Sequence, residues 1–541
     1  MVPGRKGAVT RRVAQLIASA LAVVVAWGAS GSFAAADQVY PGPTPRANCG
    51  PGSHPETGRQ GRLTVAGVPK APFFCNMQLI SHYGVRGGYK VERYVDKQGH
   101  ECAIYDSTLL FPKDAVAAGQ DLTGAYVLDM TDPAHPVHTT TLVTPAMQSP
   151  HESMGLNQKR GLLMAVTGNP AFGPPSADVY DVTTDCRHPA LQSITTSGLF
   201  GHEGNWAPDG KTYYSAGWYS EHVVAVDVSN PTAPVPLWVG SFGHQHGLSI
   251  SDDGKRAYMA TEAGSLPGAV DNALTIVDTS TIQSRGLNPQ VPVVSVLNWP
   301  SRSTPQASIP VTIQGHKYLI EFDEFGGGSP QIGAARIIDI ADDVHPRVVS
   351  NIKLEVNMPQ NQADQAGDPG ATALFRGYGA HYCEVPQRDE PNVLACTFIL
   401  SGLRFFDIRD PFHPREIGYY NPVPHKSIDG SPDSQDPASN FSMSKPAFVP
   451  SRNEIWFTDG NSGFYALRLT NGAGSIVPGA PRTGPYVVGD NTALTASTQA
   501  NPNTSTGRNP LRLLLALALL LACIASAGLV GRRPARGGAR P

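Results

Sequence analysis

The sequence predicts an all-β protein, a β-propeller with seven blades, followed by one C-terminal transmembrane helix. Three observations lead to this prediction: a turn-rich composition, a short apolar phrase that recurs along the chain, and a long apolar run near the C-terminus. Only 16% of the residues are charged, while glycine occurs 56 times and proline 48 times. A weakly charged chain with so many turn-forming residues is typical of all-β proteins.

The recurring phrase consists of about four apolar residues and an aspartate, which a proline-containing turn often follows. Its residues are β-branched or aromatic and the run is too short for a helix, so it indicates a strand buried on both faces. The aspartate can accept hydrogen bonds from backbone N–H groups of the following turn, which makes it structural. Six clear copies end at Asp129, Asp181, Asp227, Asp278, Asp339 and Asp407, and a weaker seventh, Phe464 to Leu467, has Arg468 in the aspartate position.

The segment around the fourth copy shows the length of one repeating unit. Strands are expected at 247–250, 256–261, 274–278 and 293–297, with a hairpin turn at Asp252-Asp253-Gly254. Four antiparallel strands in about 45 residues make one propeller blade. Seven copies therefore predict seven blades, with each phrase as the third strand of its blade.

These phrases resemble the LVIVD repeat, which Leu274 to Asp278 nearly spells. The resemblance covers residues 73–472 and is good in six copies and poor in the last. It implies a bacterial surface or exported β-propeller, in a family whose biochemical roles are mostly unassigned. Because the last copy is weak, we expect a strand from the N-terminal end to complete the seventh blade.

The two ends of the chain indicate export and membrane anchoring. A basic start, an apolar run from Val13 and the small residues Ala34-Ala35-Ala36 are typical of a signal peptide; the alternative is an uncleaved anchor. Leu513 to Val530 carries no charge, would span about 27 Å as a helix, and is followed by arginines that favour the cytoplasm. The predicted division is a signal peptide (1–36), an N-terminal extension (37–72), the propeller (73–472), a flexible stalk (473–510), a transmembrane helix (511–530) and a cytoplasmic basic tail (531–541).

This division predicts a single-pass protein of the cell membrane with an extracellular propeller. The net charge of −3 argues against a nucleic-acid-binding surface. The expected partners are the membrane, through the C-terminal helix, and an extracellular protein or small molecule. Six cysteines precede the predicted span, and Cys383 and Cys396 are the predicted disulfide pair because they lie on neighbouring strands of one hairpin.

Histidines at the predicted blade starts form the candidate functional site. The first strand of a blade lines the central channel, so its first residues ring one end of that channel. Imidazoles there could bind a divalent transition metal such as Zn²⁺, Fe²⁺ or Cu²⁺; the alternatives are structural histidines and an organic ligand. The candidate metal ligands are His151, His202, His246 and His381.

Three carboxylate-bearing segments accompany these histidines. Neighbouring residues of a strand point to opposite faces, so His151 and Glu152 are not both expected in the channel, which favours an all-histidine site. Glu203 is the expected acceptor for a second ring N–H of a ligand histidine. The segment from Glu321 to Glu324 offers oxygens for Ca²⁺, but a solvated hairpin end is the preferred interpretation.

Two classes of function follow. The first is a ligand-binding or protein-binding module, because no nucleophile elbow, phosphate loop or dinucleotide motif is present in the sequence. The alternative is a metal-dependent enzyme, such as an oxidoreductase, with axial histidine ligands in the channel. In that case the chain resembles the selenium-binding-type methanethiol oxidases only as a propeller with histidines near its axis.

Overall fold

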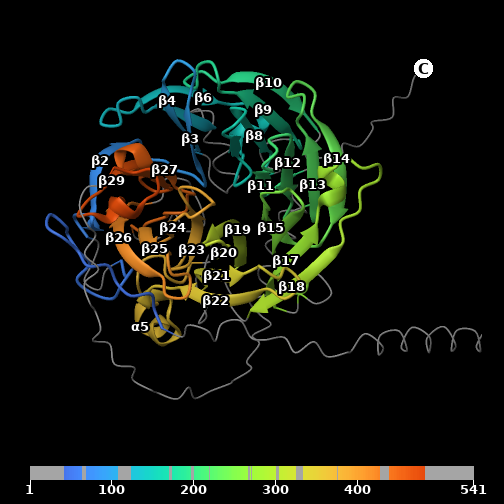
Figure 1. Ribbon diagram of the computed structural model, residues 1–541. Helices are drawn as coiled ribbons and strands as arrows, with labels where there is room; N and C mark the ends of the chain where they lie inside the picture. Colours follow the sequence, from blue (N-terminus) through green and yellow to red (C-terminus); the bar gives the residue numbers. More distant parts are fainter. Residues whose placement is uncertain are drawn as a thin grey trace, which may run out of the picture. The chain divides into compact units, whose positions relative to one another are not determined.

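The computed structural model is an all-β propeller in which seven sheets surround a central channel, as Figure 1 shows, and it confirms the predicted fold and blade number. All described residues belong to one compact unit, Met1–Val488. The structure describes residues 42–63, 69–107, 124–169, 174–196, 200–218, 220–265, 269, 271–299, 304–324, 333–373, 376–426 and 438–481.

The first five blades are four-stranded antiparallel sheets whose strands follow one another along the chain, from the channel outwards. Blade one contains β3 (Val91–Val95), β4 (Glu101–Asp106), β5 (Ala125–Asp129) and β6 (Val137–Leu142). Blade two contains β7 (Gly155–Asn157), β8 (Leu162–Val166), β9 (Ala177–Asp181) and β10 (Ala190–Thr195). Blade three contains β11 (Glu203–Trp206), β12 (Thr212–Ala216), β13 (His222–Asp227) and β14 (Val235–Ser241). Blade four contains β15 (Gln245–Ile250), β16 (Arg256–Thr261), β17 (Asn272–Asp278) and β18 (Val293–Trp299), and blade five contains β19 (Thr304–Ile313), β20 (His316–Glu324), β21 (Ala335–Asp339) and β22 (Arg347–Ile352).

The N-terminal part of the propeller closes the ring by adding strands to the last two blades. Blade six contains β23 (Ala380–Glu384), β24 (Val393–Phe398), β25 (Gly402–Asp407) and β26 (Arg415–Asn421), with β1 (Phe73–Cys75) as a fifth, outer strand. Blade seven contains β27 (Ala447–Val449), β28 (Glu454–Asp459) and β29 (Gly463–Leu469), and β2 (Met77–Tyr83) is its outermost strand. The predicted completion of blade seven by an N-terminal strand is therefore confirmed, and Figure 1 shows β2 beside β29.

Every copy of the recurring phrase is the third strand of its blade, as predicted. The six aspartates each accept a hydrogen bond from the backbone N–H two residues later, at distances of 2.7–3.1 Å. A carboxylate at this place satisfies a turn N–H that no strand partner reaches. The aspartates therefore have a structural role, each within the turn that follows its own strand.

The hydrophobic core lies between the blades. Seven clusters of buried side chains occur among the described residues, and each joins two neighbouring blades around the ring. Ile104 and Val127 of blade one, for example, pack with Leu163 and Tyr180 of blade two. The third strands carry apolar residues on both faces because each face packs against a different blade. Helices are short: α3 (Pro145–Gln148), α4 (Ser280–Gln283), α5 (Gln362–Gln365) and the 3-10 turns Glu355–Asn357, Pro359–Asn361, Pro450–Arg452 and Ala473–Ile476.

Disulfides and ion pairs attach the N-terminal extension and join neighbouring elements. The structure confirms the predicted Cys383–Cys396 bridge between β23 and β24. Cys49–Cys75 ties the extension to β1, and Cys102–Cys186 joins blades one and two. Buried Arg404 of β25 pairs with Glu56 of the extension and with Glu416 of β26. These contacts hold residues 42–63 on blade six.

The predicted signal peptide, transmembrane helix and cytoplasmic tail lie outside the described residues, as does most of the predicted stalk. Within the described part of the chain, no helix is both long and apolar enough to cross a bilayer. Residues 473–481, assigned to the stalk from the sequence, pack on the propeller: Val477 is buried in the cluster between blades six and seven, and Ala480 packs against that cluster.

Candidate metal centre

A ring of side chains lines one end of the channel. Most of them come from the first residues of the innermost strands, where the sequence placed its candidate histidines. Blade five has no histidine there, but Glu324, the last residue of β20, lies at the same end because β20 runs antiparallel to β19. Around the channel, blades one to six contribute Tyr89, His151 with Glu152, His202, His246, Glu324 and His381 in that order.

Local irregularities aim these side chains at the channel. His151 has a φ of 50°, in the left-handed region, and Glu152 forms only an isolated bridge with Glu203 rather than belonging to β7. In β15 and β23 the register shifts across the segment that contains His246 or His381. Bulges of this kind redirect side chains. The expectation of an all-histidine set assumed that neighbouring side chains alternate between the two faces of a strand. That alternation does not hold here, and both His151 and Glu152 reach the cluster.

Two carboxylates lie between the imidazoles. The Nε2 atom of His381 is 2.9 Å from one oxygen of Glu324 and 3.2 Å from one oxygen of Glu152. The Nε2 atom of His246 is 3.2 Å from the other Glu324 oxygen and 3.5 Å from the other Glu152 oxygen. The Nε2 atom of His202 is 3.5 Å from that same Glu152 oxygen and 2.7 Å from the Nε2 atom of His246. The cluster is therefore a mixed set of nitrogen and oxygen atoms.

Aromatic rings pack around the imidazoles. The ring centroid of His151 is 4.1 Å from that of His202 and 4.3 Å from that of Tyr89, which stacks on it. Tyr89 also lies 5.7 Å from the His381 ring. On the opposite side, half-buried Trp218 lies 5.6 Å from His202 and 5.0 Å from His246. This packing restrains the orientation of the imidazole rings.

The cluster is buried. The side chains of His246, His381 and Glu152 have no exposed surface, whereas 10% of His202, 6% of Glu324 and 5% of His151 are exposed. Among the candidate ligands, these three side chains are the ones that retain some contact with solvent.

Burial and mutual contact shift the pKa values of these groups. Burial lowers the pKa of His246, but Glu324 and Glu152 outweigh it and raise the pKa to about 9. Burial also lowers the pKa of His381, and its contacts with Glu152 and Glu324 raise the pKa to about 9. Burial lowers the pKa of His151 to about 4, against the pull of Glu152. Protonated His246 and His381 thus balance the two carboxylates in the metal-free protein.

The pKa values of the two carboxylates, Glu152 and Glu324, shift in opposite directions. Burial raises the pKa of Glu152, but the neighbouring imidazoles, led by His151, outweigh it and hold the pKa well below its usual range. Burial raises the pKa of Glu324, and its histidine neighbours oppose this only in part. Glu152 is therefore the ionised carboxylate at the middle of the cluster.

The hydrogen-bond partners around the candidate ligands differ from the expected ones. The Nδ1 atom of His381 lies 2.6 Å from the carbonyl oxygen of Met443 in blade seven, which leaves Nε2 directed at the carboxylates. Glu203, the expected partner of a ligand histidine, instead accepts a 2.8 Å hydrogen bond from the buried ammonium group of Lys90. A carbonyl acceptor on the second ring nitrogen is common among metal-binding histidines.

The structure corrects one further expectation. Glu321, Asp323 and Glu324 are buried, not part of a solvated hairpin end. Glu321 and Asp323 both pair with the buried guanidinium of Arg336, which accounts for their burial, and only Glu324 enters the cluster. From the sequence, Glu324 was considered only for Ca²⁺ and was not grouped with the histidines, because it lies on a second strand; the available signal was the lack of histidine at the start of blade five.

The geometry fits a divalent transition metal. Neighbouring atoms bound to one ion through bonds of 2.0–2.2 Å lie about 2.8–3.6 Å apart in octahedral or tetrahedral sites. The contacts between candidate ligand atoms of His202, His246, His381, Glu152 and Glu324 span 2.7–3.5 Å. Neutral imidazoles and carboxylates are ligands of Zn²⁺, Fe²⁺ and Cu²⁺. These five side chains are the ones that would hold an ion.

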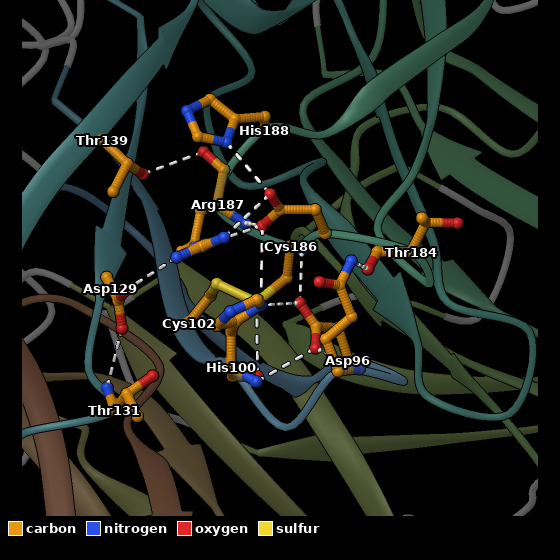
Figure 2. A network of polar contacts seen from close by, with 12 residues as sticks. Asp96, His100, Cys102, Asp129, Thr131, Thr139, Thr184, Cys186, Arg187 and His188 are labelled. Atoms are coloured by element: carbon orange, nitrogen blue, oxygen red, sulfur yellow. Dashed lines mark hydrogen bonds and ion pairs between the residues drawn. A yellow bond between two sulfur atoms is a disulfide. The ribbon is translucent and has the colours of Figure 1, made fainter.

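A second group of histidine and carboxylate side chains lies at the rim between blades one and two. Asp96, His100 and Asp185 have ligand-type atoms within 4.8 Å of one another. Figure 2 shows Asp96 and His100 in a network of hydrogen bonds and ion pairs beside the Cys102–Cys186 disulfide. Asp96 accepts hydrogen bonds from the backbone N–H groups of Gln98, His100 and Cys186, at 2.8–3.0 Å. Its oxygens are already satisfied by the protein.

No protein-family model and no curated protein matches the chain. Solved structures with a similar fold include a putative 6-phosphogluconolactonase from Bacteroides fragilis, with 10% identity over 63% of this chain and 88% of that chain and a TM-score of 0.41. The periplasmic gluconolactonase of Pseudomonas aeruginosa has 13% identity over 64% of this chain and 92% of its own, with a TM-score of 0.40. Hydrazine synthase of Kuenenia stuttgartiensis has 12% identity over 72% of this chain and 97% of its own, with a TM-score of 0.43. At such values the function has to be argued from the site itself.

Proposed function

We propose that the protein is a metal-dependent enzyme whose active centre is a divalent transition-metal site in the propeller channel. The observation that carries the proposal is the environment of Glu152. Both of its oxygens are buried, neither accepts a well-aligned hydrogen bond from the described residues, and both face imidazole nitrogens. Burial of an ionised carboxylate is costly unless it is paired or coordinates a metal.

An enzyme differs from a purely structural metal site in the coordination of its ion. Structural zinc sites are closed by four protein ligands, whereas catalytic sites keep a position for water or substrate. The proposal places that position beside His202, which at 10% is the most exposed of the candidate ligands. The bound ion would supply Lewis acidity or, with Fe²⁺ or Cu²⁺, redox chemistry, so an oxidoreductase is the preferred class. The chain's own residues would bind the ion and orient a small substrate beside Trp218.

The proposal includes the predicted location. The signal peptide and the apolar run Leu513–Val530, which lie outside the described residues, support a propeller held on the outer face of the cell membrane. The three disulfides support an oxidising compartment. Membership of the LVIVD-repeat proteins stays a prediction on the residues that resemble that repeat.

Elemental analysis of the purified full-length protein tests this function. We expect at least one equivalent of Zn, Fe or Cu per chain, or the uptake of that amount when metal-free protein is titrated with each ion. The His244→Ala variant is the matched control, because His244 is half exposed and faces Glu221 rather than the cluster. A wild-type chain that neither contains nor takes up a transition metal would contradict the proposal.

The second candidate is a protein-binding module, and one surface feature favours it. Val137, Leu191, Ile194, Val235 and Val239 on the outer strands of blades one to three are each 47–58% exposed. Exposed aliphatic side chains on neighbouring elements are typical of interaction surfaces when they form a continuous patch. Binding through this surface would not need the metal, so a metal-free protein would leave this candidate in place.

A further inference from the structure

We propose that the channel binds two divalent ions, bridged by the carboxylate of Glu152. The inference rests on the proposed metal site and specifies how many ions that site takes and which residues hold each one. Three observations support it: the number of candidate ligands, their division into two groups, and the environment of His151.

The cluster offers more ligands than one open metal site uses. Catalytic sites bind their ion through about three protein side chains. Here four imidazoles and two carboxylates converge, namely those of His151, His202, His246, His381, Glu152 and Glu324. Six ligands on a single ion would fill its coordination sphere and leave no position for a substrate. Six ligands divided between two ions leave each ion open.

The geometry divides these ligands into two groups that share Glu152. One group is His151, Glu152 and His202, and the other is Glu152, His246 and Glu324; within each group the ligand atoms lie within 4.8 Å of one another. His381 joins the second group, since its Nε2 atom contacts one oxygen of Glu324 and one of Glu152.

The two oxygens of Glu152 face different imidazoles. One oxygen is 3.2 Å from Nε2 of His381. The other is 3.5 Å from Nε2 of both His202 and His246 and 3.9 Å from Nδ1 of His151. The Nε2 atoms of His202 and His246 are 2.7 Å apart, so the two groups meet at this oxygen. A carboxylate whose oxygens serve different ions bridges them at the separation of about 3.5–4 Å that is usual in two-metal sites.

A single ion held by the other five ligands does not account for the environment of His151. Its imidazole is 5% exposed, and neither ring nitrogen has a hydrogen-bond partner among the described residues. Buried polar groups without partners are rare in native proteins. Its ring lies between those of Tyr89 and His202, with centroid distances of 4.3 Å and 4.1 Å, which restrains its orientation. An ion bound by His151, His202 and Glu152 would satisfy this imidazole.

The charge of the cluster defines what else the pair of ions would bind. Two divalent ions carry four positive charges, of which Glu152 and Glu324 offset two. Glu203 adds none, because Lys90 neutralises it. Glu262 also acts on His246 and offsets a third charge when it is ionised. The remaining positive charge favours a small anion, supplied by solvent or substrate.

Cobalt titration of the metal-free, full-length protein tests the inference. We expect two equivalents of Co²⁺ per chain after gel filtration, and a weakened electron paramagnetic resonance signal because a shared carboxylate couples the two ions magnetically. The His151→Ala and His381→Ala variants should each retain one equivalent, with an uncoupled signal. His244→Ala should retain two, and circular dichroism should show that all three variants are folded.

The possible failures are distinguishable. One equivalent in the wild type, retained by His151→Ala and lost by His381→Ala, would overturn the two-ion inference and leave the proposed metal enzyme standing. No bound cobalt, zinc, iron or copper in the wild type would overturn both.

Discussion

Among the described residues, two regions of this propeller bring histidine and carboxylate atoms together in groups of three, and the two regions differ in the hydrogen-bond donors around their carboxylates. At the rim, Asp96 and Asp185 accept hydrogen bonds from backbone N–H groups and, for Asp185, from the guanidinium of Arg187 (Figure 2). In the channel, Glu152 accepts no such bond from the described residues and meets only imidazoles.

The difference shows that the hydrogen-bond donors around a carboxylate indicate its availability for a metal better than its distance from a histidine does. At the rim, backbone donors and a permanently charged arginine stabilise the carboxylates without any ion. In the channel, an imidazole that contacts the carboxylate can lose its proton and become a ligand, so the same contact can be replaced by a metal. Four predictions test this comparison, from the largest expected effect to the smallest.

The Glu152→Gln variant should lose its bound metal, whereas Asp96→Asn should keep it. The amide of glutamine cannot supply the charge or the two-sided contact of the carboxylate, so we expect affinity to fall by at least about 100-fold. Asp96→Asn leaves the channel intact and should only lower stability, by about 1–3 kcal/mol. Metal content after gel filtration and guanidinium unfolding measure both effects. Equal metal content in the two variants would remove the proposed distinction between channel and rim.

Metal affinity should rise steeply with pH. His246 and His381 have pKa values of about 9 in the metal-free protein, so both are protonated at neutral pH and must lose a proton to become ligands. Affinity should therefore increase by up to about 100-fold per pH unit below pH 9 and level off above it, with about two protons released per chain.

Calorimetric titrations in buffers of different ionisation enthalpy count these protons. An affinity that stays constant from pH 6 to pH 9 would show that the two imidazoles are not displaced from their carboxylates by the metal.

The disulfide beside the rim network should stabilise the fold without affecting the channel. Cys102–Cys186 closes a loop with a sequence separation of 84, compared with 13 for Cys383–Cys396. Replacing the first pair by serine should lower the free energy of unfolding by about 2–4 kcal/mol, and replacing the second should cost less, because a longer loop loses more entropy on closure. Denaturant unfolding measures both, and metal content should equal that of the wild type. A greater loss from the shorter loop would contradict this account.

The repeated aspartates should have the smallest individual effect. Asp181 accepts a 2.7 Å hydrogen bond from the backbone N–H of Thr183, and Asp181→Ala should lower stability by about 1 kcal/mol. Lys159→Ala, on an exposed turn of the same blade, is the control and should change stability by less than about 0.5 kcal/mol. Unfolding midpoints measure the difference, and loss of metal from Asp181→Ala would mean that these aspartates act beyond their turns.

The strands and turns were predictable because their signals are local. Residues 256–261 and 274–278 were expected as strands and lie in β16 and β17. Each is an apolar run bounded by a turn whose residues can be recognised in sequence. The weak seventh copy correctly indicated that an outside strand completes that blade.

The candidate site was predictable only in part. Position at a blade start was enough to select the histidines, because the first residues of inner strands meet at one end of the channel. Glu152 was discounted because neighbouring side chains were expected to alternate between the two faces of a regular strand. The left-handed conformation of His151 interrupts that alternation. Glu321 and Asp323 were expected in solvent, but Arg336 from the neighbouring strand neutralises them in the interior. No pattern of spacing reveals such a partner.

By itself, then, the sequence determined the all-β class, the seven blades, the structural role of the repeated aspartates and the set of histidines at the blade starts. These features depend on side-chain periodicity and on hydrogen bonds between residues two positions apart. Only the tertiary structure decided that Glu152 and Glu324 stand among His202, His246 and His381, and that His151 lies near the same Glu152 oxygen as His202 and His246. Closure of the ring and bulges in the inner strands bring these residues together, and both depend on packing between blades that are distant in the chain.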